Sequence, residues 1–159
     1  MEFKEIVSKV AQNYKDRSKI EAINTKIWID EVKKLYQKIE EWLAEYIEHS
    51  DIIIEIGEFQ NYDVDDDIEA TYTMYLNFGG DFGPSIVFEP TGINIAEALG
   101  KIDLYYLGHK EEIVSLLLIK ENNEDVSWQL MKNSKNCKKF SKELFEKQLS
   151  EWMMKWAGV

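Results

Sequence analysis

Basic residues are missing from a long stretch in the middle of this 159-residue chain, where no Lys or Arg occurs between residues 39 and 100. These 62 residues contain 15 of the 30 acidic residues, and all 19 basic residues lie outside them. The formal net charge of −11 is therefore concentrated in one segment. A negative field repels nucleic acid and anionic lipid, so the sequence predicts neither nucleic acid nor a membrane as a partner.

Cysteine, histidine and long apolar runs are scarce as well. The single cysteine, Cys137, excludes an internal disulfide and is typical of a reducing compartment. The two histidines form no H-x-H or H-E-x-x-H pattern, so we expect no zinc and no other cofactor. Runs such as 116–119 are far too short to span a membrane, and the chain opens on charged residues. The expected location is cytoplasmic.

Enough apolar and aromatic side chains remain to build a core. Hydrophobic residues make up 45% of the chain and aromatic residues 13%, which is unlike an acidic disordered sequence. No repeat, low-complexity tract or linker divides the chain. We therefore predict a single domain that spans residues 1–159.

The first 48 residues have the periodicity of helices. Phe3, Ile6, Val7, Val10, Ala11 and Tyr14 share one helical face, and Trp28, Val32, Leu35, Ile39, Trp42 and Tyr46 follow at steps of three and four. Ser18 and Glu21 have the spacing of a capping box, so we expect a second, long amphipathic helix from about residue 19 to residue 48.

After residue 50 the pattern changes to the alternation of strands. Strands are predicted at 51–56, 68–78, 85–89, 101–107, 111–120 and 126–131, with turns at 79–84, 90–92, 108–110 and 121–125. A final helix begins after Ser141, with Phe140 and Phe145 spaced to contact each other across its first turn. The layout predicts the α+β class: N-terminal helices, an antiparallel meander of about five to six strands and a C-terminal helix.

The densest acidic cluster is Asp63, Asp65, Asp66, Asp67 and Glu69. Its first three alternate acids match the start of an EF-hand loop, but Ile68 stands where that loop needs Gly and Met74 where it needs Glu. Three interpretations stay open: a solvated loop between strands, a cation-binding loop at residues 63–69, and an acidic binding surface for a basic protein.

A carboxylate-based hydrolase is a further alternative. It needs two acids in one pocket, and Asp103 with Glu89 or Glu97 is the candidate pair. Cys137 lies near several Lys residues, a setting that favours a reactive thiol, but no neighbouring His supplies a base for nucleophilic catalysis. A homo-oligomer is also open, through the long helix or through the C-terminal helix with Trp152, Met153 and Trp156.

The sequence thus favours a non-enzymatic acidic binding protein that engages a basic partner through residues 39–100. Small bacterial immunity proteins and phage-encoded inhibitors are similar in size, acidity and α+β layout, although no motif supports the likeness. The expected partner-binding residues are Glu55, Glu58, Tyr62, Asp63, Asp65, Asp66, Asp67, Glu69, Tyr72 and Tyr75. The acids would attract the partner, and the tyrosines would anchor it.

Overall fold

The structure is a computed structural model that describes residues 1–95, 97–123, 125–133 and 136–159. Within these residues it has helices α1 (Phe3–Trp42), α2 (Ala44–Glu48) and α3 (Lys142–Trp156) and a seven-stranded antiparallel sheet. The predicted α+β class, with N-terminal helices, a meander and a C-terminal helix, is confirmed. The sheet has slightly more strands than the five or six expected.

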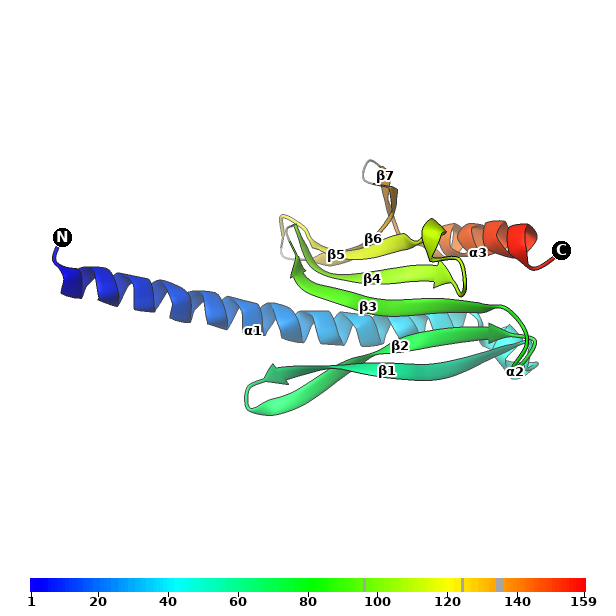
Figure 1. The fold of residues 1–159 in the computed structure, drawn as a ribbon, viewed down its shortest axis with the longest axis horizontal. Coiled ribbons are helices and arrows are strands. Elements are labelled where there is room, and N and C mark those ends of the chain that lie inside the picture. Colours follow the sequence, from blue (N-terminus) through cyan, green and yellow to red (C-terminus); the bar gives the residue numbers. More distant parts are fainter. Residues whose placement is uncertain (96, 124, 134–135) are drawn as a thin grey trace.

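The strands lie side by side in chain order (Figure 1). They are β1 (Ile52–Val64), β2 (Asp67–Phe78), β3 (Ser85–Ile95), β4 (Ala98–Tyr106), β5 (Val114–Lys120), β6 (Val126–Asn133) and β7 (Asn136–Lys139). A short 3₁₀ helix, η1 (Lys110–Glu112), stands between β4 and β5. Among the described strands, β1 and β7 are therefore the two edges of the sheet.

The predicted helix boundary at Ser18 is wrong, because α1 runs without a break from Phe3 to Trp42. No Gly or Pro occurs before Gly57, so nothing in this part of the chain stops a helix once it has started. The helix ends instead at Leu43, whose backbone leaves helical geometry, and α2 follows directly.

Several predicted strand boundaries are also wrong. β1 continues eight residues beyond the expected end at Ile56, through a bulge at Gly57 and Glu58. β3 continues through Pro90, where a second bulge absorbs the irregularity. β5 begins three residues late because η1 occupies the preceding positions, and β7 was not predicted. Residue 124, in the predicted turn 121–125, lies outside the described residues.

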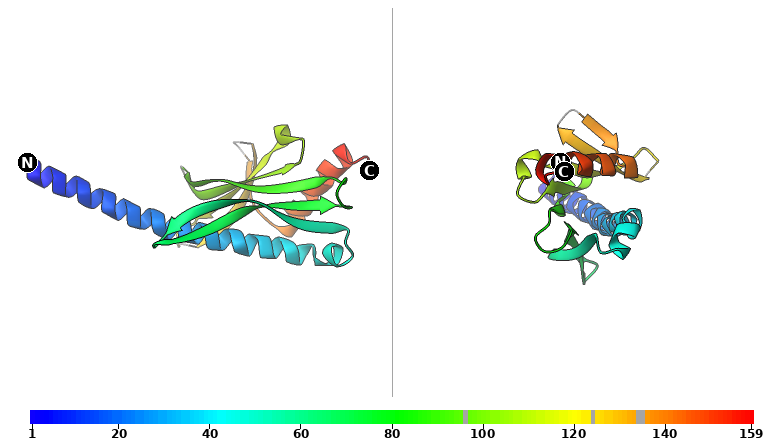
Figure 2. Two further views of the ribbon diagram at one scale, coloured as in Figure 1. Left: turned by 60° about the horizontal axis from the view of Figure 1, so that its bottom comes forward. Right: turned by 90° about the vertical axis from the view of Figure 1, so that its right-hand side faces the viewer.

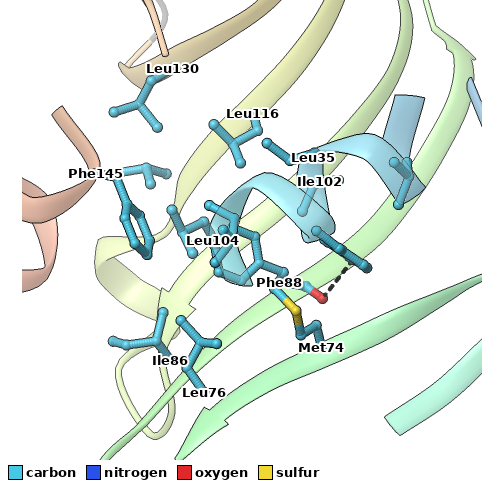
Figure 3. Packing of buried hydrophobic residues seen from close by; sticks show 14 of the residues in the cluster. Leu35, Met74, Leu76, Ile86, Phe88, Ile102, Leu104, Leu116, Leu130 and Phe145 are labelled. Atoms are coloured by element: carbon cyan, nitrogen blue, oxygen red, sulfur yellow. Dashed lines mark hydrogen bonds between the residues drawn. The ribbon is translucent and has the colours of Figure 1, made fainter. Parts of the chain in front are cut away.

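The core lies between one face of the sheet and the two long helices. Leu35 from α1 and Phe145 from α3 point toward Phe88 and its neighbours on β2 to β6 (Figure 3). Trp28 of α1 is fully buried, and its ring lies against the backbone of β4 at Gly100. A side chain at residue 100 would occupy the space of this ring, so the glycine permits the close approach of helix and sheet.

The start of α3 agrees with its sequence signals. The Ser141 hydroxyl accepts a hydrogen bond from the Leu144 backbone N–H at 3.2 Å, and the Phe140 and Phe145 ring centroids lie 6.0 Å apart. Later in the helix, Trp152 is buried and Trp156 stacks on His109 at 4.0 Å. No helix among the described residues is both long and apolar enough to cross a membrane.

The first half of α1 extends away from the sheet (Figures 1 and 2). Every residue from 3 to 21 is exposed, and burial starts only at Thr25. We call residues 3–21 the arm. The apolar face predicted at Phe3, Val10 and Tyr14 is thus a helical face, but no other part of the described structure covers it.

Candidate functional site: the acidic β1–β2 hairpin

The acidic cluster forms the end of a long β-hairpin. Val64 pairs with Asp67, so only Asp65 and Asp66 make up the turn. Both have positive φ, at 49° and 66°, which is the geometry of a type I′ turn. Asp tolerates this conformation better than most residues, although Asn-Gly is the preferred pair. A tight turn thus replaces the loop that the sequence suggested.

The hairpin is acidic along its whole length. Residues 52–78 contain seven acidic and no basic residues. Asp63, Asp65, Asp66 and Asp67 are exposed, as is Glu58 at the bulge, and none has an ion-pair partner among the described residues. Glu55 accepts a hydrogen bond from the Asn77 amide at 3.0 Å. Most of this charge is therefore uncompensated at the surface.

One basic residue of α1 contacts the hairpin. Lys26 donates a hydrogen bond to Glu69 at 2.7 Å and lies 3.4 Å from Asp30. The hydrogen bond to Glu69 is the main reason that the pKa of Lys26 is raised above its ordinary value. Lys26 thus fixes the hairpin to the helix while leaving the four aspartates free.

Two of the three predicted tyrosine anchors contact α1 instead of facing only solvent. The Trp28 indole N–H donates to the Tyr62 hydroxyl at 3.3 Å, and the Tyr36 hydroxyl donates to the Tyr72 carbonyl at 2.8 Å. Tyr62 and Tyr72 point to opposite faces of the hairpin, so the hairpin twists as it passes the helix. Tyr75 is half-buried, and its ring lies over Gly57 at the bulge.

Four exposed apolar side chains accompany the acids, and the sequence analysis missed them as a group. They are Ile53, Ile56, Phe59 and Ile68. Phe59 is 63% exposed and Ile68 is 73% exposed, although both lie in strands. The Gly57 bulge shifts the register between Ile56 and Phe59, which broke the alternation by which this strand could have been recognised.

A groove next to the turn adds a second apolar element. It has a volume of about 470 Å³ and lies between α1 and the hairpin end. Its lining residues are Lys19, Ala22, Ile23, Lys26, Ile27 and Asp65. The groove therefore combines three apolar side chains with two lysines and one aspartate.

The acids of residues 39–100 do not gather at one point. Glu41, Glu45 and Glu48 lie around the junction of α1 and α2, next to the start of β1. The turn at Asp65 lies at the other end of β1, and 13 extended residues span about 40 Å. Glu41, Glu45 and Glu48 follow at steps of four and three, which would place them on one face of a continuous helix, but the helix breaks between Glu41 and Glu45.

The structure offers little support for metal binding. Among the described residues, no three His, Cys, Asp or Glu side chains are close enough together to hold one ion. Asp65 and Asp66 follow each other in the turn, while Asp63 and Asp67 belong to its two strands.

The predicted carboxylate pair does meet in space. Glu89 and Asp103 are direct neighbours across β3 and β4. Each has its own partner, however: Lys110 lies 3.6 Å from Glu89, and Lys101 lies 3.5 Å from Asp103. The Tyr105 hydroxyl also donates to Glu89 at 3.4 Å. Glu97 lies beyond the end of this pairing, near the β3–β4 connection.

The pair lacks the surroundings of an acid–base site. Within the described part of the chain, neither Glu89 nor Asp103 lines any of the five cavities at its surface. Lys101 lies two residues from Asp103 on the same strand, and Lys110 reaches Glu89 from η1, so both carboxylates are neutralised by neighbouring cations without a ligand.

A small cavity of opposite charge lies at the other edge of the sheet. It has a volume of about 70 Å³ between β6, β7 and α3, and three of its lining residues are Lys132, Lys138 and Lys147. Gln148 also lines it, and the Gln148 Oε1 atom is buried without a hydrogen-bond partner among the described residues. Lys132 is engaged with Glu151 at 3.3 Å. A single water molecule would satisfy the amide, so this cavity needs no ligand.

Comparisons with known proteins give no family. A scan against protein-family models, a search of curated proteins and a search of solved structures each find no match to this chain.

Proposed function

We propose that this chain is a non-enzymatic binding protein that engages a basic protein through the β1–β2 hairpin. The observation that carries the proposal is the combination, on one edge of the sheet, of seven acidic residues, no basic residue and four exposed apolar side chains. Acidity alone would promote only solubility. On the hairpin face that carries Ile56, Phe59 and Ile68, exposed apolar side chains among the acids give a surface that also gains from being covered, while Ile53 lies on the other face.

The acids would act mainly before contact. Uncompensated charge at Asp63, Asp65, Asp66 and Asp67 steers a basic partner toward the hairpin and raises the association rate. Phe59 and Ile68 would then supply the apolar contact that slows dissociation. They replace Tyr62 and Tyr72 as the proposed anchors, because the Tyr62 hydroxyl is bonded to Trp28 and the Tyr72 ring lies 5.2 Å from the Tyr36 ring of α1.

The free edge of β1 offers a second means of attachment. β1 has no neighbouring strand on its outer side among the described residues, so its outward backbone groups are available to an extended segment of a partner. Glu55 and Glu58 lie on this strand and would favour a segment rich in Lys or Arg. The same charges oppose edge-to-edge pairing between two copies.

An inhibitor of a basic enzyme, such as a nuclease toxin, fits this chemistry. Proteins that act on nucleic acid carry a basic surface, and an acidic surface of matching shape blocks it. The likeness to immunity proteins and phage inhibitors stays one of class, carried by size, acidity and fold class. A cytoplasmic location is part of this proposal and agrees with the single, exposed Cys137.

The two alternatives have less support. A cation-binding loop at residues 63–69 would need converging oxygens, which the two-residue turn at Asp65 and Asp66 does not provide. A hydrolase that uses Asp103 and Glu89 would need a cavity between acids that are not already paired with Lys.

The test is a binding comparison between two matched triple variants. D65N/D66N/D67N and E41Q/E45Q/E48Q each remove three negative charges, one at the turn and the other about 40 Å away. Each variant and the wild type are immobilised, exposed at low salt to lysate of the source organism, and eluted with rising salt. A basic protein recovered in stoichiometric amount is then purified for rate measurements.

We expect D65N/D66N/D67N to slow association of that protein about tenfold at low salt, with the difference shrinking as salt is added. E41Q/E45Q/E48Q should bind almost as the wild type does. The reverse ranking would move the binding surface to the α1–α2 junction. Equal binding by all three proteins, or recovery of many unrelated basic proteins, would contradict the proposal.

A further inference from the structure

Among the described residues, the arm carries a stripe of apolar side chains that no other element covers; only Tyr14 has a neighbour, the Arg17 guanidinium 5.3 Å from its ring centroid. Phe3 is 80% exposed and Tyr14 is 62% exposed, and Ile6, Val7 and Val10 between them are also exposed. Most helices in proteins gain their stability from packing of an apolar face and not from the intrinsic propensity of their residues. The arm therefore has both an apolar face to cover and a helix to stabilise.

The uncovered face is a continuation of the face that α1 uses inside its own fold. Residues that are seven or eleven apart lie close to one side of a helix, and Val32, Leu35 and Ile39 on that side are buried against the sheet. Phe3 and Val10 lie on the same side of the helix, four turns or more earlier. Between the two stretches the side carries Arg17, Glu21 and Asn24, which are polar. The apolar pairing surface is thus limited to residues 3–14.

We propose that residues 3–14 form an antiparallel pair with the same residues of a second copy of this chain. The stripe is self-complementary in that direction. When residue i meets residue 17 − i of the other copy, Phe3 meets Tyr14, Ile6 meets Ala11 and Val7 meets Val10. These are the alternating core layers of a two-stranded antiparallel coiled coil, with a large aromatic residue at each end and smaller residues in the middle.

The charges of the arm agree with the same register. Glu2 of one copy comes beside Lys15 of the other, and the same contact is repeated at the other end of the pair. A parallel pair would place Lys15 beside Lys15 and Glu2 beside Glu2. Opposite ends of the arm therefore attract when the two copies run in opposite directions.

The geometry also leaves room for both folded bodies. The pair ends at residue 14, and burial by the sheet begins only at Thr25, about 16 Å further along the helix. Two copies can approach through their arms without contact between their sheets. A lipid surface is the competing occupant of an amphipathic helix with Lys on its polar side. The net charge of −11 disfavours the approach of the whole chain to anionic lipid.

The experiment is sedimentation equilibrium of the full chain from about 1 to 300 μM. We expect a reversible monomer–dimer equilibrium in the wild type. Val10→Asp places a charge in the middle of the stripe and should raise the dissociation constant at least tenfold. Ser8→Asp is the matched control, because it adds the same charge on the opposite side of the helix and should leave the constant within about twofold.

Direction is tested by disulfide trapping in a Cys137→Ser background. Phe3→Cys and Tyr14→Cys proteins should cross-link when they are mixed, and neither should cross-link alone. Cross-linking of Phe3→Cys with itself would show a parallel pair. A chain that stays monomeric at all concentrations, a dimer that Val10→Asp does not weaken, or Val10-dependent pelleting of monomer with anionic lipid vesicles would each overturn the proposal.

Discussion

Replacing Gly100 by Ala tests how closely α1 packs on the sheet. A Cβ atom at residue 100 would lie 2.4, 2.5 and 2.6 Å from three ring carbons of Trp28, whereas ordinary contacts begin near 3.4 Å. The ring must therefore move by about 1 Å, which is the shortfall from that contact distance. It is held by the Trp128 ring at 5.6 Å and by its hydrogen bond to Tyr62.

The cost follows from the degree of overlap. Overpacking of a buried site costs about 1–3 kcal/mol, and replacing Gly by Ala recovers about 0.4–1 kcal/mol through the unfolded chain. We expect a net loss of about 1–2 kcal/mol in the free energy of unfolding. In a chain of this length that lowers Tm by about 2–8 °C. Thermal unfolding followed by circular dichroism and chemical denaturation give the two quantities.

Two controls isolate the contact. Gly92→Ala places a Cβ 3.2 Å from only the Ile95 Cγ2 methyl group, so it should change stability by less than about 0.5 kcal/mol. In a Trp28→Leu background, Gly100→Ala should become neutral, giving a coupling energy of about 1 kcal/mol or more in the double-mutant cycle. If Gly100→Ala is neutral or stabilising in the wild type, the close packing of Trp28 on β4 is wrong.

Three further predictions address the packing of the core, the loss of stability at high pH and the conformation of the β1–β2 turn. Phe145→Ala should lower the free energy of unfolding by about 3–5 kcal/mol in denaturant titrations, since the ring is fully buried. Burial raises the pKa of Tyr36 well above its ordinary value of 10.0, so stability is intact below that pH and falls above it as the unfolded chain ionises. Tyr36→Phe should make this alkaline fall shallower in unfolding curves at pH 9–12. D65N/D66G, with the preferred type I′ pair, should raise Tm by about 1–4 °C and weaken binding of a basic partner. A lower Tm would show that the turn is not of that type.

The elements with an undisturbed period could be predicted from sequence. The buried face of α1 from Trp28 to Ile39, the face of α3 and the Ser141 cap appear in the structure where the residues indicate them. The alternation of β2 holds at Met74 and Leu76, but Ile68 is exposed and Thr71 and Thr73 are buried. β1 could not be followed past Ile56, because the bulge between Ile56 and Phe59 interrupts the alternation and leaves both side chains exposed. β7 lacked any signal, since its four residues are Asn, Cys and two Lys, all exposed.

The candidate site shows a different limit. The acidic residues could be named in advance, but their separation into a hairpin end and a helix junction depends on β1 being 13 residues long. The exposure of Phe3 and Val10 could not be predicted either, because an amphipathic helix has the same sequence periodicity whether or not a sheet covers its apolar face. Burial depends on what else in the chain comes near, which is a property of topology.

Because α1 is one unbroken helix, it holds a fixed distance between its free end and the sheet. Its 40 residues contain neither Gly nor Pro and span about 60 Å, with one half clamped under the sheet and the other free. If the α1 helices of two copies pair over residues 3–14, the Thr25 positions, where each helix becomes buried against its own sheet, are about 50 Å apart. Two acidic hairpins would then be presented at a fixed separation. A partner with two basic sites at that spacing would gain avidity that a flexible tether of the same contour length does not provide.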